Sequence, residues 1–396
     1  MNLRPLTAIT GAEVWAPQPV PGLCTVSIRA GTITGLSNAP PHPAQQVLVA
    51  QDALLVPGLI DLQINGALGW SFQAKDRAHF DEIAAFHLAR GTTTFLPTLI
   101  TADENVLRNS LAVLADYARQ AGPFTIPGIH LEGPFLSPER KGAHDPDYLR
   151  LPDPLLMERF LQAAGGMLRL FTLAPELPGA VELISGLVAQ GVVVAGGHTA
   201  AAFADFQRAV RAGMTFLTHV GNASDWPHRA LNDYGFMGSQ PGLVGSLMAL
   251  PQLGGSVILD GFHFHPALLK PLVELKAGQM VLISDASTVC GFPPGTYESG
   301  GLIATIHPAG HATSGRGGGW LAGSTITLLQ GVQNAVQLAG LPLAAALPLA
   351  TENPARLLGL EGQKGQIRPG ADADLLVLNR DLSLRHVIVK GQLVAN

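Results

Sequence analysis

The sequence contains very little cysteine and little charge. Only two cysteines, Cys24 and Cys290, occur among 396 residues, which excludes a disulfide framework and a structural zinc site built from thiolates. Charged residues make up 13% of the chain and hydrophobic residues 47%, a balance that excludes an intrinsically disordered protein. The composition therefore indicates a globular protein with a sizeable core.

An excess of positive charge and a long apolar segment are also missing. The net charge is −5, whereas a general nucleic-acid binder needs a basic face. No run approaches the roughly 18 apolar residues of a membrane span, and the first residues, MNLRPLTAIT, lack the pattern of a signal peptide. We expect a cytoplasmic protein that binds neither nucleic acid nor membranes, although a local group of donors could still hold a small anion.

Both ends of the chain have the pattern of short β-strands. Near the N-terminus, TVSIRAGTITGL reads as two strands around a turn at Ala30-Gly31. Near the C-terminus, LLVLN, HVIVK and QLV read as three more strands separated by turn residues. We expect one small β-sandwich domain assembled from residues 1–56 and 362–396.

Residues 57–361 alternate between strand-like and helix-like patterns. The expected strands are LIDLQING, TTTFLPTLI, FTIPGIHLEG, LRLFTLAPE, VVVAGGHT, MTFLTHVG, GSVILDGFHF and QMVLISDAS. Several are continuously apolar, as in parallel strands buried on both faces, and most intervening helical segments end on glycine. Eight such units predict an α/β fold of the (β/α)8 TIM-barrel type. The alternative is an open, doubly wound sheet.

Four of these runs end near a residue that can bind a metal ion or a proton. They are Glu132, His198, His219 and Asp285. In a (β/α)8 barrel the chemistry lies at the C-terminal ends of the strands. A glutamate and two histidines suit a catalytic zinc ion that keeps one position open for water. Asp285 is the expected general base, since a carboxylate beside such a water can accept its proton.

The first expected strand, LIDLQING, indicates a site for one metal ion and not for two. Two-metal hydrolases on this scaffold have a pair of histidines where this chain has Gln63 and Asn65. Neutral amides are poor zinc ligands, so we expect one divalent ion per subunit. The ligand set favours Zn2+ but also accepts Fe2+ or Co2+. Gln63 is expected to line the site by hydrogen bonding and to be one of the substrate-binding residues.

An ordered set of motifs carries a resemblance to a known family. PGLIDLQING, GTTTFLPTLIT, IHLEGPFL, KGAH, TLAPE, GGHT, LTHVGNA, QPGLVG, DGFH, ISDA and LAGS together resemble the N-acetylglucosamine-6-phosphate deacetylases of the amidohydrolase superfamily. The resemblance runs from about Pro57 to the C-terminal β segment. It implies a homodimer that hydrolyses the N-acetyl amide of N-acetyl-D-glucosamine 6-phosphate to D-glucosamine 6-phosphate and acetate.

The resemblance also implies roles for individual residues. The zinc ligands of the family match Glu132, His198 and His219, and its catalytic aspartate matches Asp285. His144, in KGAH, would help polarise the substrate carbonyl, and His263, in DGFH, would contact the sugar phosphate. The remaining positions that match substrate contacts are Ala143, Asn222, Ala223, Leu321, Ala322 and Gly323. The segment 293–320 is expected to border this site.

One departure from the family concerns the phosphate. Ser239 stands where the family has an arginine, and serine cannot reproduce the bidentate fork of a guanidinium group. Arg229 or His228 could supply a donor from a different position, or Arg229 could be an ordinary loop residue. An alternative is therefore an amidohydrolase that deacylates an unphosphorylated or different N-acyl amino sugar or a related N-acyl compound. A remote alternative is a non-catalytic scaffold with the same fold.

Overall fold

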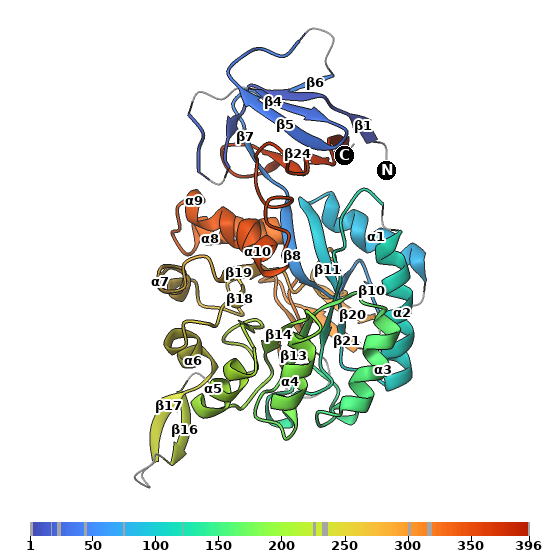
Figure 1. Cartoon of the computed structure of the whole chain (residues 1–396), viewed down its shortest axis with the longest axis vertical. Helices are drawn as coiled ribbons and strands as arrows, with labels where there is room; N and C mark the ends of the chain where they lie inside the picture. Colours follow the sequence, from blue (N-terminus) through green and yellow to red (C-terminus); the bar gives the residue numbers. More distant parts are fainter. Residues whose placement is uncertain are drawn as a thin grey trace.

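The computed structural model describes most of the chain and joins its two ends. It covers residues 3–16, 18–21, 25–42, 46–73, 76–120, 122–224, 227–231, 237–299, 302–314 and 319–394. Figure 1 shows strands from both termini packed together at one end of the molecule, with the helices and parallel strands below them. Among the described residues, no helix has the length and apolar character needed to cross a membrane.

The expected alternation of strands and helices between residues 57 and 361 is present. Six strands form a parallel sheet in the order β15-β14-β13-β12-β11-β8. They are β8 (Leu59–Ile64), β11 (Thr92–Ile100), β12 (Ile129–Glu132), β13 (Leu168–Leu173), β14 (Val193–Gly196) and β15 (Phe216–Leu217). A parallel pair, β18 (Gly255–Ile258) and β19 (Met280–Ile283), completes the eight expected strands. The chain thus has an α/β fold with parallel strands.

The helices follow these strands. They are α1 (Arg77–Leu88), α2 (Glu104–Arg119), α3 (Pro154–Ala164), α4 (Ala180–Val188), α5 (Phe203–Arg211), α6 (Leu243–Ala249), α7 (Leu269–Leu275), α8 (Leu328–Gln337), α9 (Leu343–Ala346) and α10 (Glu352–Leu357). An aspartate caps the N-terminus of each of the first three helices and accepts a backbone N–H of the first turn. These caps are Asp76 for α1, Asp103 for α2 and Asp153 for α3. The short helices α6, α9 and α10 were not expected from the sequence, because they lack a long apolar stripe.

Short 3₁₀ helices and small sheets complete this part of the chain. The 3₁₀ helices are η1 (Pro138–Arg140), η2 (Pro146–Tyr148), η3 (Pro266–Leu268) and η4 (Leu347–Ala350). The additional strands are β9 (Gly66–Ala67), β10 (Trp70–Ser71), β16 (Pro227–Leu231), β17 (Met237–Pro241), β20 (Gly295–Ser299), β21 (Leu302–Ile306) and β22 (Ala312–Ser314). Strands β20, β21 and β22 form one antiparallel sheet.

The terminal segments form two further sheets. Their strands are β1 (Leu3–Pro5), β2 (Ala8–Thr10), β3 (Glu13–Val14), β4 (Thr25–Arg29), β5 (Thr32–Ser37), β6 (Val47–Val49), β7 (Leu54–Pro57), β23 (Leu375–Leu378), β24 (Leu384–Val389) and β25 (Gln392–Val394). The expected turn at Ala30-Gly31 joins β4 to β5, and both residues have positive φ angles, 51° and 81°. Strand β1 pairs with β25, so the two ends of the chain share a sheet.

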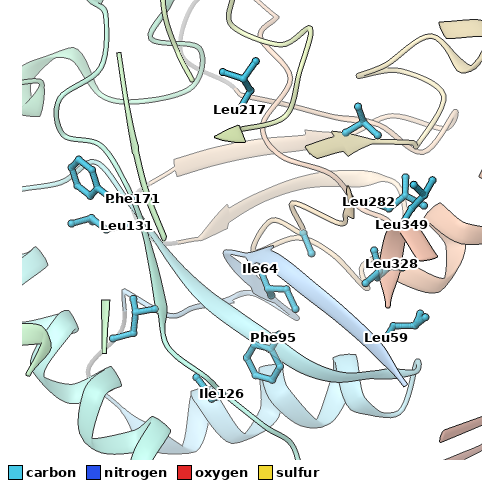
Figure 2. Packing of buried hydrophobic residues seen from close by; sticks show 14 of the residues in the cluster. Leu59, Ile64, Phe95, Ile126, Leu131, Phe171, Leu217, Leu282, Leu328 and Leu349 are labelled. Carbon is cyan, nitrogen blue, oxygen red and sulfur yellow. The ribbon is translucent and has the colours of Figure 1, made fainter. Parts of the chain in front are cut away.

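Apolar side chains between the strands and helices form the main core. Figure 2 shows part of this cluster, in which Leu59 and Phe95 from the first two parallel strands lie near Leu328 and Ile126. The expected stripe of α1, formed by Phe80, Ile83, Ala84 and His87, is buried. Burying one such aromatic or aliphatic side chain stabilises a fold by roughly 1.5–3 kcal/mol.

His87 makes the stability of this core depend on pH. It is fully buried, its Nε2 lies 3.2 Å from the carbonyl oxygen of Gly66, and burial lowers its pKa to about 4. Because an unfolded histidine titrates near 6.5, the unfolded chain binds the extra proton first as the pH falls. The contribution of neutral His87 to the free energy of unfolding is therefore complete above about pH 6.5. It is lost as the pH falls toward 4, by up to about 3 kcal/mol.

A comparison of two proteins isolates this effect. We expect the urea midpoint of the wild type to fall between pH 7 and pH 5 by more than that of a His87→Gln variant, because glutamine does not titrate. Equal falls in both proteins would show that His87 does not contribute to the acid sensitivity.

Candidate active site

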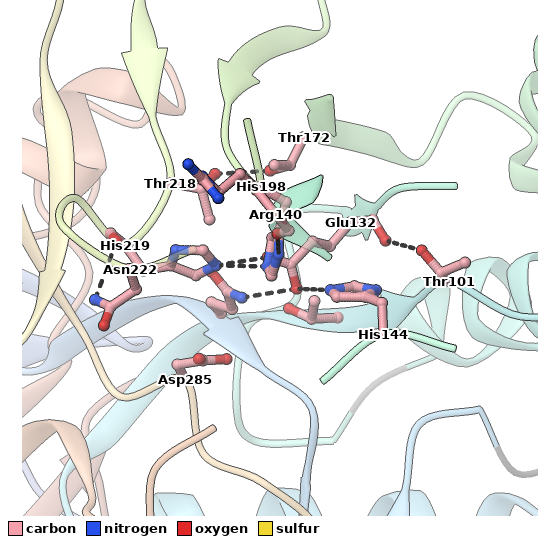
Figure 3. A network of polar contacts seen from close by, with 12 residues as sticks. Thr101, Glu132, Arg140, His144, Thr172, His198, Thr218, His219, Asn222 and Asp285 are labelled. Carbon is pink, nitrogen blue, oxygen red and sulfur yellow. Dashed lines mark hydrogen bonds and ion pairs between the residues drawn. The ribbon is translucent and has the colours of Figure 1, made fainter. Parts of the chain in front are cut away.

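The four residues at the strand ends meet in one buried cavity. Glu132 is the last residue of β12, and His198, His219 and Asp285 each stand two residues beyond the end of β14, β15 and β19. All four line a cavity of about 380 Å³ and are at most 8% exposed. Figure 3 shows Glu132, His198 and His219 turned toward one another, with Asp285 beside them.

Glu132, His198 and His219 have the arrangement of a metal-ligand set. His219 Nε2 lies 2.8 Å from Glu132 Oε1 and 3.1 Å from His198 Nε2. His198 Nδ1 lies 3.0 Å from the carbonyl oxygen of Arg140. Because a carbonyl can only accept, Nδ1 carries the proton and Nε2 is left with a lone pair. The three ligand atoms lie within 4.8 Å of one another, which fits one divalent ion.

The charges in the cavity support ligand chemistry at Glu132. Burial opposes its ionisation, but the contacts with His198 and His219 hold the pKa of Glu132 well below its ordinary value. Gln63 is 1% exposed and donates through Nε2 to Glu132 Oε2 at 3.2 Å. Gln63 therefore lies behind the carboxylate and outside the lining of the cavity, and not in the cavity wall where the sequence placed it, because its amide is taken up by Glu132. Glu132 is left with Oε1 facing the two histidines.

Several residues of the cavity have uncommon backbone angles. His198, His219, Ala223 and Asp285 have φ angles of +47°, +30°, +46° and +47°. Such angles cost of order 1–3 kcal/mol for residues other than glycine and persist only where the surroundings hold them. Backbone hydrogen bonds do so here, since Ser324 N donates to the Asp285 carbonyl at 2.8 Å. Three of these four residues, His198, His219 and Asp285, are candidate metal-binding or catalytic groups.

Glu176 holds the segment that follows His198. It comes after β13, and its carboxylate accepts from the Thr199 hydroxyl at 2.5 Å and from Ala200 N at 2.8 Å. We expect a Glu176→Ala variant to lose about 1–3 kcal/mol of unfolding free energy, because the buried Thr199 hydroxyl and the half-buried Ala200 N–H lose their acceptor. It should also bind metal more weakly, since the backbone of His198 is no longer held.

Urea unfolding and metal analysis of the purified protein test this expectation. Glu182, an exposed glutamate on α4, provides the control variant Glu182→Ala. If the two variants were equally stable and held equal amounts of metal, Glu176 would have no such structural role.

Asp285 has the properties of a residue that accepts and returns a proton. Burial and the negative charge of Glu132 raise its pKa to about 6. A general acid or base works best with a pKa near the pH at which it operates. Asn65 Nδ2 donates to Asp285 Oδ1 at 2.7 Å. The sequence identified Asn65 only as a missing metal ligand and did not predict this contact.

The other positions named from the sequence lie in the same cavity wall. They are Ala143, His144, Asn222, Ala223, His263, Leu321, Ala322 and Gly323. His144 Nε2 lies 3.7 Å from Glu132 Oε2, and burial together with the neighbouring His198 lowers the pKa of His144 to about 3. His144 is therefore neutral at pH 7. His263 Nδ1 lies 2.7 Å from Asp260 Oδ2.

The sheet of β20, β21 and β22 forms part of the wall. Ile303, Ala304 and Ser314 from this sheet line the cavity, as do Gly319 and Trp320. The segment expected to border the site thus does so, but its three strands were not predicted. The apolar pattern of LIATI was the available signal, and the many surrounding glycine and serine residues obscured it.

The structure describes only the backbone of the residues that could bind the 6-phosphate in place of an arginine. His228 and Arg229 lie in β16 and Ser239 in β17, and Arg229 is the direct register partner of Ser239. Figure 1 shows this hairpin projecting from the body of the protein. The side chains of these three residues lie outside the described part of the chain. Among the described residues that line the cavity, none is lysine or arginine.

Comparisons with known proteins agree with this arrangement. The Amidohydrolase family profile matches residues 54–394. An N-acetylglucosamine-6-phosphate deacetylase from Bacillus subtilis is 30% identical, covering 93% of this chain and 92% of the relative. An N-acetylgalactosamine-6-phosphate deacetylase from Escherichia coli O157:H7 is 32% identical, covering 89% and 91%. The human N-acetylglucosamine-6-phosphate deacetylase is 34% identical, covering 86% and 83%.

Solved structures of the same group are also similar. A mutant of N-acetyl-D-glucosamine-6-phosphate deacetylase from Mycobacterium smegmatis, in complex with N-acetyl-D-glucosamine-6-phosphate, has a TM-score of 0.88 and 34% identity. The match covers 99% of this chain and 100% of that one. The Pasteurella multocida N-acetylglucosamine-6-phosphate deacetylase has a TM-score of 0.89 and 27% identity, covering 99% and 100%. The chain is therefore an amide-hydrolysing enzyme that belongs to the amidohydrolase family, in the group that contains these deacetylases.

Proposed function

We propose that the chain hydrolyses the N-acetyl amide of N-acetyl-D-glucosamine 6-phosphate, giving D-glucosamine 6-phosphate and acetate. One observation carries the proposal: a metal-ligand set of Glu132, His198 and His219 faces the same cavity as a buried Asp285 with a pKa of about 6. Relatives at 30–34% identity bear the names of this activity and cover most of the chain.

Glu132, His198 and His219 would hold one divalent ion, and the donor set fits Zn2+ best. When bound, such an ion lowers the pKa of a coordinated water and polarises a carbonyl oxygen. Fe2+ and Co2+ are compatible with the same donors. Gln63 and Asn65 occupy the positions of a second ligand pair, and their side chains bond to Glu132 and Asp285, which supports a single-metal site.

Asp285 and His144 carry out the proton transfer and the stabilisation of negative charge. Asp285 accepts a proton from the water as its oxygen attacks the amide carbon. It then returns that proton to the leaving nitrogen, so the C–N bond breaks and acetate and the free amine form. A neutral His144 retains one N–H, which donates to the carbonyl oxygen as negative charge develops there. The cavity walls hold the sugar through the substrate positions named above, with His263 toward the phosphate.

A second candidate substrate differs at one hydroxyl. The Escherichia coli relative is named for N-acetylgalactosamine 6-phosphate, whose sugar is the C4 epimer of glucosamine. A third candidate, an unphosphorylated N-acyl amino sugar, is supported by Ser239 and by the lack of lysine and arginine among the described lining residues. The scaffold alternative no longer applies, since the chain belongs to a family of amide-hydrolysing enzymes and all three metal ligands and Asp285 are in place.

Steady-state kinetics with a panel of substrates tests the assignment. We expect the kcat/KM for N-acetylglucosamine 6-phosphate to exceed that for N-acetylglucosamine and for N-acetylgalactosamine 6-phosphate. A preference for the unphosphorylated sugar would contradict the proposal, and a preference for the galactose epimer would transfer it to the second candidate. Arg229→Ala and His228→Ala variants then show whether either residue contributes to binding of the 6-phosphate.

We also propose that the eight parallel strands close into a (β/α)8 barrel covering residues 57–361. Backbone bonds from Leu217 N to Gly254 O and a parallel bridge between Ile64 and Ala286 link the six-stranded sheet to β18 and β19. One apolar cluster gathers side chains from seven of the eight strands. These features support closure around a common interior.

The terminal strands support a separate small domain. Two sheets contribute to one cluster that contains Ile9, Val26, Leu375 and Ile388, as in a β-sandwich. We propose that residues 1–56 and 362–396 form this domain. The homodimer, the cytoplasmic location and the absence of nucleic-acid and membrane partners stay predictions.

A further inference from the structure

We propose that Asn65 is a positioning residue that fixes the rotation of the Asp285 carboxylate, leaving one oxygen free for proton transfer. The inference rests on the proposed function, because it assumes that Asp285 moves the proton. It concerns a residue that is part of neither the ligand set nor the substrate positions described above.

The backbone brings the two residues together at the junction of β8 and β19. Asn65 directly follows β8, and Ile64 pairs with Ala286 in a parallel bridge. Asn65 N donates to the Ala286 carbonyl at 2.9 Å. The backbone of Asn65 is therefore anchored to the residue that follows Asp285, although 220 residues separate Asn65 and Asp285 in sequence.

Asn65 is the one side chain that holds the Asp285 carboxylate in the described structure. Its Nδ2 donates to Asp285 Oδ1 at 2.7 Å, the short distance of a hydrogen bond to a charged acceptor. The φ angle of +47° and the bond from Ser324 N fix only the Asp285 backbone. The terminal torsion of an aspartate is broad, so the carboxylate would turn freely without Asn65. With it, Oδ2 remains available for the proton.

The orientation of the Asn65 amide follows from the charge of its partner. An ionised carboxylate only accepts, so the atom facing Asp285 Oδ1 must be the NH2 group. This orientation leaves Asn65 Oδ1 buried and without a partner among the described residues. A buried acceptor without a partner lowers stability. The arrangement therefore carries a cost to stability that the bond to Asp285 explains.

Gln63, two residues before Asn65 and on β8, makes a similar contact with a second carboxylate. Its Nε2 donates to Glu132 Oε2, while Oε1 faces the histidines. Gln63 and Asn65 thus each bond one oxygen of a different carboxylate. Under the proposed function, the other oxygen of each carboxylate serves the metal ion or the proton. This pattern points to orientation of carboxylates as the shared task of the two side chains.

The test uses an Asn65→Leu variant, which keeps the approximate volume and removes the donor. We expect kcat to fall about 10–100-fold with KM and metal content unchanged, because a misplaced group costs up to about 10²-fold. In an Asp285→Asn background the same change should cause no further loss, since effects within one unit are not additive. Asn105→Leu is the matched control, because Asn105 is exposed on α2 and lies outside the cavity lining, and its kcat should stay near that of the wild type.

A crystal structure of the Asn65→Leu variant gives a readout independent of activity. We expect the Asp285 carboxylate to adopt a different or a mixed rotation. A wild-type kcat in this variant, an equal loss in the Asp285→Asn background, or an unchanged carboxylate would overturn the inference. Absence of deacetylation by the wild type would instead refute the proposed function, and the crystal structure would still decide whether Asn65 orients Asp285.

Discussion

An Asp285→Asn variant should lose turnover by about 10²–10⁴-fold, the range typical for a general acid or base, while keeping its metal. The amide has nearly the same shape as the carboxylate, but it cannot accept a proton from water or return one to the leaving nitrogen. Asp285 is not a member of the three-residue ligand set, so metal binding should survive. Steady-state kinetics and metal analysis of the purified variant measure both quantities.

The matched control is an exposed aspartate. Asp147 lies on η2 at the surface, and Asp147→Asn should retain wild-type kinetics. If Asp285→Asn kept a tenth or more of the wild-type kcat, or if it lost its metal, Asp285 would not be the proton-transfer residue.

A His219→Gln variant should lose most of its metal and with it more than about 10³-fold of kcat/KM, since metal-activated water supplies the nucleophile. His219 Nε2 is the ligand atom nearest to the other two, at 2.8 Å from Glu132 Oε1 and 3.1 Å from His198 Nε2. A neutral amide is a poor replacement. Metal content after dialysis and kcat/KM with and without added Zn2+ report the effect.

A histidine outside the cavity provides the comparison. His265 is exposed just before η3, and His265→Gln should keep the wild-type amount of metal. Full metal occupancy in His219→Gln would show that the ligand set differs from the one proposed.

The strand–helix alternation could be predicted because burial leaves a strong local signal. The run TTTFLPTLI forms β11, and all but its last residue are buried, as in a parallel strand that is covered on both faces. The caps Asp103 and Asp153 and the left-handed Gly165 mark helix ends through local chemistry. Each of these signals lies within a few residues of the element it defines.

The contacts that orient the candidate site could not be predicted in the same way. Asn65 reaches Asp285 across 220 residues, and Glu176 reaches Thr199 across 23 residues. Their partners are set by how neighbouring strands pack, and no local pattern encodes that choice. Likewise, the backbone of His198, which has a positive φ, accepts a bond from Ser137 N in a loop 61 residues earlier.

Specificity for a 6-phosphate depends on which residue binds the phosphate group. Arg229 is the register partner of Ser239 in the β16–β17 hairpin, so an arginine stands opposite the position where the resemblance implies one. The substrate panel and the Arg229→Ala variant address this point directly, because loss of a phosphate contact raises KM only for the phosphorylated sugar.

The central claim is that one metal ion, held by Glu132, His198 and His219, supports amide hydrolysis in this cavity. Its most direct test is a titration of metal-free protein with Zn2+, following release of acetate and free amine from N-acetylglucosamine 6-phosphate. We predict that equal amounts of acetate and amine appear and that the rate rises up to one equivalent per chain and then levels off. No release at any ratio, or a rate that needs two equivalents, would contradict the account.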